Sequence, residues 1–141
     1  MRAVTYSLTA SVPVAMDRVF DLLIDPARMP EWVPACRAAS APTPLERGSL
    51  IKLQFAAREA ELEVIELKRP SAFAWVEREP RRHWRTSFRL NFAGGLTSVT
   101  VQQIWMPPSL GTWLRAKFFP KRNVAARLDR LVQDLRKAVS K

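Results

Sequence analysis

The stretch from Ser11 to Cys36 constrains the fold most, because three kinds of local structure follow one another there without a break. Residues 4–12 alternate between apolar and polar side chains, which is the pattern of a half-buried strand that Pro13 ends. Residues 15–25 place apolar side chains on one helical face, and Asp25 precedes a proline, which stops a helix. Residues 30–34 begin and end with proline and have room for about one helical turn.

The region from residue 50 to residue 105 predicts a series of strands separated by turns. Further strands are expected over residues 50–56, 60–68, 72–79, 82–92 and 99–105. With residues 4–12 these are six ranges, and we expect about seven strands in total. Gly94 and Gly95 predict a hairpin turn between the last two. Val64 and Ile65 are adjacent apolar residues that would point to opposite faces, and they predict a β-bulge.

The alternation assigns the side chains of the later strands to two faces. We expect the inner face to carry four aromatic residues and one valine, namely Trp75, Trp84, Phe88, Trp105 and Val101. Glu77 and Gln103 fall on the same face. Arg78, Arg85 and Arg89 fall on the opposite, outer face.

The last third of the chain predicts one long helix from about Ser109 to near Ser140. Apolar residues recur at spacings of three and four and form a single stripe, namely Val124, Leu128, Leu131, Leu135 and Ala138. We expect this helix to lie across the sheet and to be kinked or divided near Pro120, because an interior proline removes one backbone donor.

The opening of the chain resembles that of the START-like, birch-pollen-allergen-like (SRPBCC) superfamily. The residues that carry the resemblance are Val12-Pro13, the run from Val19 to Leu23, Asp25-Pro26, and Pro30-Glu31-Trp32 followed by Val33-Pro34. Within the superfamily the chain looks most like the polyketide cyclase/dehydrase group and its coenzyme-Q-binding relatives. The resemblance implies an α+β helix-grip fold, in which a curved antiparallel sheet wraps around a long C-terminal helix and two short helices follow the first strand. It also implies a cavity for an apolar ligand between sheet and helix.

The length and the residue types restrict the other features that we expect. A chain of 141 residues has room for one domain, residues 1–141. The sequence shows no secretory signal and no apolar run that could span a membrane, so we expect a cytoplasmic protein. Cys36 is the only cysteine and His83 the only histidine, so neither a metal nor an internal disulfide is expected. None of the four glycines forms a phosphate-binding loop, and no cofactor is predicted.

The net charge of +10 lies in the second half of the chain. Fourteen Lys and Arg residues follow position 70, against four Asp and Glu residues. We expect the side chains of Arg78, Arg85, Arg89, Arg130 and Lys137 to face solvent. They would add to solubility and give a weak, salt-sensitive attraction for anionic surfaces such as membranes, without a specific nucleic-acid site.

The predicted ligand site combines the inner face of the sheet with the segment that would cover it. Its expected residues are Trp75, Glu77, Trp84, Phe88, Val101, Gln103 and Trp105 from the sheet, and Trp113, Leu114 and Phe118 from the covering segment. Residues 110–122 would form a lid, with Leu110 and Phe119 also on its apolar side. The alternative is that these rings simply fill the core. Glu77, Gln103 and Glu66 would either orient a ligand or reach water at the rim.

Three functions are compatible with this sequence. The first is binding of a hydrophobic small molecule or lipid-like ligand. The second is a cyclase, dehydratase or aromatase acting on a polyketide-like substrate, with Glu66 or Glu77 raised in pKa by burial or with Tyr6 as proton donor. The third is ribosome or RNA association, as in the coenzyme-Q-related toxin branch, which the segment from Pro30 to Cys36 loosely resembles. The sequence assigns neither a catalytic residue nor an oligomeric state.

Overall fold

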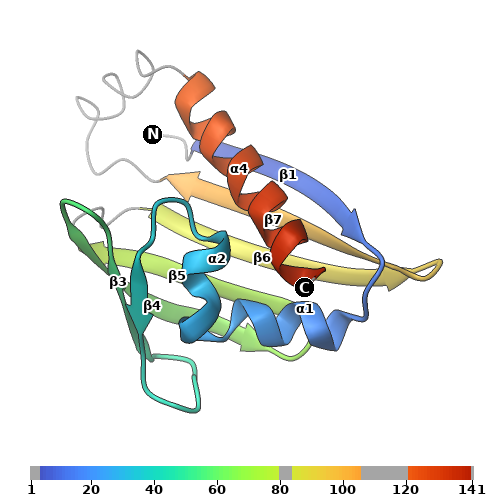
Figure 1. The fold of residues 1–141 in the computed structure, drawn as a ribbon, viewed down its shortest axis with the longest axis horizontal. Helices are drawn as coiled ribbons and strands as arrows, with labels where there is room; N and C mark the ends of the chain where they lie inside the picture. The colour runs from blue at the N-terminus through green and yellow to red at the C-terminus, as the bar shows by residue number, and fades with distance from the viewer. Residues whose placement is uncertain (1–3, 80–83, 106–120, 141) are drawn as a thin grey trace.

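Seven strands form one curved antiparallel sheet in the computed structural model, which describes residues 4–79, 84–105 and 121–140 (Figure 1). The order across the sheet is β1-β7-β6-β5-β4-β3-β2, so β2 to β7 follow one another as a meander and β1 joins the edge beside β7. The strands are β1 (Val4–Val12), β2 (Ala38–Ser40), β3 (Leu50–Gln54), β4 (Glu59–Lys68), β5 (Ala72–Glu79), β6 (Trp84–Ala93) and β7 (Leu96–Trp105). The sequence pattern did not predict β2, because three residues are too few to show a period.

The helices lie on one face of this sheet (Figure 1). Between β1 and β2 the chain forms α1 (Met16–Leu23), the 3-10 turn η1 (Pro26–Arg28) and α2 (Met29–Trp32). The C-terminal helix α4 (Lys121–Val139) packs on β1, α2 and α1. The α+β helix-grip architecture, with two short helices after the first strand, is therefore confirmed.

The boundaries of the first elements follow from their prolines and caps. Strand β1 ends at Val12, directly before Pro13. Helix α1 buries its apolar face and ends at Leu23. A carboxylate oxygen of Asp25 then accepts a hydrogen bond of 3.1 Å from the backbone N–H of Ala27, and Pro26 is the first residue of the new turn. This cap redirects the chain from α1 into α2.

The turn between β6 and β7 fixes the register of the whole hairpin. Gly94 and Gly95 have φ values of +61° and +77°, a left-handed conformation that glycine adopts without strain. The two residues join Ala93 to its partner Leu96, and the pairing continues without a shift to Trp84 opposite Trp105. The turn thereby decides which side chains of the two strands face each other.

The predicted bulge in β4 is present. The register between β4 and β5 shifts between Val64 and Glu66, so Ile65 is the extra residue. As a result Val64 lies opposite Trp75 and Leu67 lies opposite Phe73, and both face the inside of the sheet. Without the bulge, a regular strand would point Val64 and Leu67 to opposite faces of the sheet.

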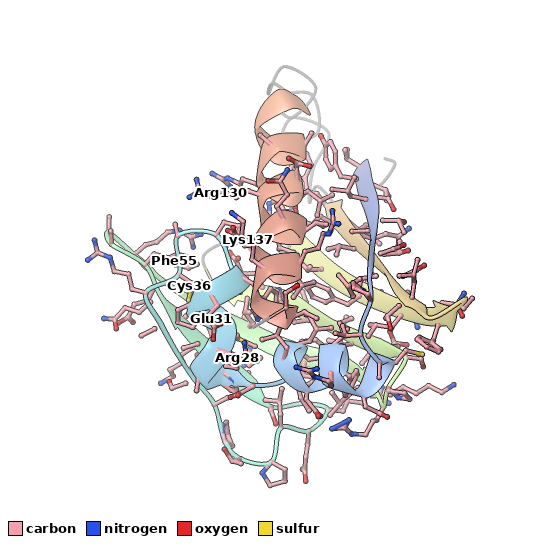
Figure 2. All side chains as sticks on the ribbon, turned by 45° about the vertical axis from the view of Figure 1, so that its right-hand side comes forward. Arg28, Glu31, Cys36, Phe55, Arg130 and Lys137 are labelled. Atoms are coloured by element: carbon pink, nitrogen blue, oxygen red, sulfur yellow. The ribbon has the colours of Figure 1, made fainter. Side chains whose placement is uncertain are left out.

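Helix α4 covers the concave face with the predicted apolar stripe. Leu128, Leu131, Leu135 and Ala138 are buried, and Val132 and Val139 widen the stripe. Arg28 joins the C-terminal end of this helix to α2 (Figure 2). Its Nη2 donates a hydrogen bond of 2.9 Å to the carbonyl oxygen of Ala138, while its guanidinium pairs with the carboxylate of Glu31. The hydrogen bond to Glu31 raises the pKa of Arg28.

Several expectations concern positions outside the described residues. They include the helix start at Ser109, the kink at Pro120 and the side chain of Val124 in the apolar stripe. Among the described residues, no helix is long and apolar enough to cross a membrane.

Candidate functional site

A stacked pair of tryptophans lies at one end of the concave face. Trp84 of β6 is directly opposite Trp105 of β7, and their ring centroids are 6.1 Å apart with an interplanar angle of 22°. Both side chains are half-buried, and Val4 of β1 lies beside Trp105 in the next strand. The predicted inner orientation of both rings is confirmed by their register with the buried Phe88 and Val101.

The next row of side chains on this face is polar. Tyr6 of β1 lies opposite Gln103 of β7, and Gln103 lies opposite Thr86 of β6. Directly opposed residues in antiparallel strands have Cβ atoms about 4.5 to 5.5 Å apart, so these three side chains form a continuous polar band. Thr86 is buried, whereas Tyr6 and Gln103 are half-buried. The polar band can supply hydrogen bonds inside an otherwise apolar wall.

A buried aromatic cluster adjoins the polar band, because Trp75 lies directly opposite Thr86 and Phe88 lies in the next row. The cluster consists of Phe73, Trp75 and Phe88 from the sheet and Trp32 from α2. The Trp75 ring lies 5.2 Å from Phe88 and 6.1 Å from Trp32, and Trp32 meets Phe88 edge-on at 5.5 Å. Trp75 and Phe88 therefore contribute to the core, as does Val101, which is fully buried opposite Phe88.

The predicted site residues thus divide into two groups. The half-buried group at the end of the sheet holds Trp84, Trp105 and Gln103, with Glu77 on the same face of β5 opposite Leu62. The buried group holds Trp75, Phe88 and Val101. Trp113, Leu114 and Phe118 lie outside the described residues, as does all of the expected lid except the backbone of Lys121 and Arg122 in α4.

Glu66 does not belong to the concave face, and its expected role on the cavity wall is wrong. The bulge at Ile65 places Glu66 opposite Ala74, whose neighbours Phe73 and Trp75 both point inward. Glu66 consequently faces outward, where its Oε1 lies 3.0 Å from Nη2 of Arg89. Sequence alternation alone could not show this, because one inserted residue exchanges the faces of every residue that follows.

The outer face carries the basic residues expected there, and two of them are paired with acids. Arg78, Arg85 and Arg89 are exposed, as are Arg130 and Lys137, which project from the same side of α4 (Figure 2). Arg78 lies 3.6 Å from Glu61 and 3.8 Å from Glu63 of the neighbouring strand. The solvent-facing prediction is confirmed, and the carboxylates of β4 offset part of the positive charge of β5 and β6.

The predicted site included neither Phe73 nor Trp32, and Trp32 comes from a helix rather than from the sheet. Its side chain has 0% of its surface exposed, and no acceptor among the described residues forms a hydrogen bond with its Nε1. The position of Trp32 between two prolines indicated a turn, and no periodicity in that turn showed which way the ring points.

The described residues contain no group of three or more His, Cys, Asp and Glu side chains that could hold a metal ion. Cys36 is buried, and its Sγ lies 3.4 Å from the carbonyl oxygen of Ala38, to which it donates. Burial raises the pKa of this thiol.

No protein-family model and no curated protein sequence matches this chain. Solved structures do match it over nearly its full length. StfQ, a di-domain ARO/CYC from the steffimycin biosynthetic pathway, superposes with a TM-score of 0.75 at 10% identity over 98% of this chain. DynU16, from the dynemicin biosynthetic locus, gives 0.73 at 18% identity over 97%. Ara h 8.0201 gives 0.68 at 13% identity, and the match covers 98% of this chain and 95% of that protein.

The expected START-like fold is confirmed. At these identities the likeness establishes the fold alone. The chain spans about half the length of two of these proteins, 47% of DynU16 and 51% of StfQ. The Aha1 protein from Colwellia psychrerythraea, solved as a dimer, matches over 96% of both chains with a TM-score of 0.73 at 13% identity. The START-like fold therefore accommodates proteins of different descriptions, and the site of this chain has to be argued from its own residues.

Proposed function

We propose that the chain binds a hydrophobic small molecule between the concave face of its sheet and its C-terminal helix. The observation that carries the proposal is the Trp84–Trp105 pair, which is stacked on the concave side but only half-buried. Phe73 and Phe88 of the same face, by contrast, are completely covered and fill the core. Accessible rings on an inward-facing surface offer a flat apolar ligand a large contact area.

The polar band beside the tryptophan pair supports a ligand with at least one polar group. Tyr6, Thr86 and Gln103 come from three adjacent strands and form one row directly next to the rings. A small number of placed polar groups in an apolar wall is the usual composition of a small-molecule site, because they orient the ligand while the rings supply affinity. The START-like neighbours from biosynthetic loci, DynU16 and StfQ, agree with such a role.

The covering segment of the site remains part of the proposal. Residues 110–122 would act as its lid, with Trp113, Leu114 and Phe118 turned toward the ligand and basic residues turned toward water. Strand β7 ends at Trp105 before this segment, and α4 begins at Lys121 within it.

Titration with N-phenyl-1-naphthylamine, a neutral dye that fluoresces in apolar surroundings, tests this function. We expect saturable binding to the wild-type protein and a roughly 3- to 10-fold loss of affinity in Trp105→Ala, because an aromatic contact contributes about 0.5 to 1.5 kcal/mol beyond its area. Trp113→Ala should weaken binding similarly. Both variants should melt close to the wild type, whereas truncation of the buried Trp75 should cost about 3 to 5 kcal/mol.

Phe92→Ala is the matched control. Phe92 lies on β6 beside the hairpin turn, is 49% exposed and belongs to no aromatic contact among the described residues. Its loss should leave dye binding unchanged. Absence of saturable dye binding to the wild type would contradict the proposed function. If Phe92→Ala and Trp105→Ala weakened dye binding equally, the tryptophan pair would not be part of the binding site.

A second candidate is a cyclase or dehydratase, favoured by the position of Glu77. Its side chain lies on the concave face in the strand next to Trp84, whereas Glu66 is excluded by its outward orientation. Glu77 and Tyr6 then stand as the candidate acid and base. Native mass spectrometry of freshly purified protein distinguishes the functions. A binding protein retains a ligand of constant mass, whereas loss of one water from that ligand on incubation would favour the dehydratase.

A further inference from the structure

A buried hydrogen-bond donor adjoins the proposed ligand site. The indole of Trp32 is completely buried, and its Nε1–H has no hydrogen-bond acceptor among the described residues. An indole nitrogen can only donate, and buried polar groups in folded proteins are nearly always paired with protein atoms, water or a ligand. The edge-on contact with Phe88 offers at most the face of a ring, which is a weak acceptor.

The position of Trp32 relates this donor to the polar band. The Trp32 ring contacts Trp75, which lies directly opposite Thr86, and it contacts Phe88, which lies two residues further along β6. Trp32 therefore lies over the sheet at the rows of Thr86 and Phe88, and the row of Thr86 is the polar band. A ligand that extends from the tryptophan pair across the polar band would bring its far end toward Trp32.

We propose that Trp32 Nε1–H donates a hydrogen bond to an acceptor at the inner end of the ligand, such as a ketone or quinone-like carbonyl oxygen. This inference rests on the proposed function. It narrows the ligand class to flat apolar molecules whose inner end carries a hydrogen-bond acceptor and no hydrogen-bond donor. A pure hydrocarbon would leave the buried indole unpaired, so the site should discriminate against it.

Competition between two probes of one shape tests the inference. 9-Fluorenone and fluorene have the same fused rings and differ in the carbonyl oxygen, and each can be titrated to displace N-phenyl-1-naphthylamine. The measured quantity is the ratio of the two dissociation constants, compared between the wild type and Trp32→Phe. We expect the preference for fluorenone to fall roughly 3- to 10-fold in the variant, the effect of one hydrogen bond. Phe92→Ala, an exposed residue outside the proposed site, is the control and should leave the ratio unchanged.

A spectroscopic measurement covers the case in which Trp32→Phe does not fold. The chain has five tryptophans, so ¹⁵N-labelled protein gives five indole signals, which Trp→Phe variants at the other positions assign. Fluorenone should shift the Trp32 indole signal downfield, and fluorene should not. An unchanged ratio, or a Trp32 signal that exchanges with water and ignores fluorenone, would overturn the inference while leaving the proposed function intact. Failure of the dye to bind at all would instead refute the proposed function and the inference with it.

Discussion

Burial gives Cys36 the chemistry of an inert thiol. Its pKa is raised because the thiolate would lose solvation, so the reactive form is scarcer than in an exposed cysteine. The favourable contribution of the neutral thiol to stability is fully present below the pKa of the unfolded state. It is lost as the pH rises through the higher folded pKa.

We therefore expect Cys36 to react with a disulfide reagent such as 5,5′-dithiobis(2-nitrobenzoate) at least about tenfold more slowly in the folded protein at pH 8 than in denaturant. Because the chain has one cysteine, the released thiolate reports this residue alone. Equal rates in the two states would contradict the burial of Cys36. The variant Cys36→Ala should lose less stability between pH 7 and pH 10 than the wild type.

The orientation of single residues was predictable where alternation was regular. The faces of Trp75, Phe88 and Arg89 follow from the period of two in β5 and β6. The same rule failed for Glu66, because the bulge at Ile65 inserts one residue into the count. Trp32 was not predictable in this way, since its burial depends on packing of α2 against α4 and the sheet.

The β6–β7 hairpin illustrates how a short element can position a site. A turn of two glycines pairs Ala93 with Leu96, and counting outward from this pair brings Trp84 opposite Trp105 and Thr86 opposite Gln103. The stacked pair and two members of the polar band could thus have been deduced from the turn. Tyr6 could not, because the partner of β1 is not set by a hairpin.

Arg28 stabilises helix α4 at the end where its carbonyl groups lack partners. We expect Arg28→Ala to lower the free energy of unfolding by about 1 to 2 kcal/mol, through loss of the bond to the Ala138 carbonyl and the pair with Glu31. The matched control is Arg130→Ala, which removes an exposed pair with Asp134 at 3.9 Å and should cost less than about 0.5 kcal/mol. Urea unfolding measures both, and equal losses would show that the contact with α4 adds nothing.

The whole molecule carries its charge of +10 on a surface where some arginines already have partners. Arg78 and Arg89 face the carboxylates of β4, so the convex face is less positive than its sequence indicates. The exposed side of α4, with Arg130 and Lys137, is a better candidate for contact with an anionic surface (Figure 2).

We expect weak binding to vesicles containing phosphatidylglycerol at low ionic strength, and its loss as salt rises toward about 0.3 M, because exposed charges are then screened within several ångströms. Vesicles of phosphatidylcholine alone are the control and should not bind. Co-sedimentation measures both. Binding that persists at about 1 M salt, or tight binding to one RNA sequence at physiological salt, would contradict this expectation.

The arrangement of the sheet as a whole could be predicted only through resemblance. Periodicity indicates strands and their faces, but no local pattern shows that β1 lies next to β7 at the opposite end of the chain. A curved antiparallel sheet with two short helices after its first strand was expected because the segment from Val12 to Pro34 resembles a START-like opening, and solved structures with this fold match the chain. The order of the strands was not predicted. Contacts between segments that are far apart in the chain are the hardest feature to predict from a single sequence.

The edge position of β1 has a consequence for the order of folding during synthesis. Thr9 lies opposite Thr100, their hydroxyl oxygens are 3.0 Å apart, and α4 covers the same strand. Strand β1 therefore precedes in the sequence the strand and the helix that it contacts, while β2 to β7 can pair as successive hairpins. Until β7 and α4 have emerged, β1 lacks its neighbours in the sheet, and we expect the pairing of β1 with β7 to be a late step of folding.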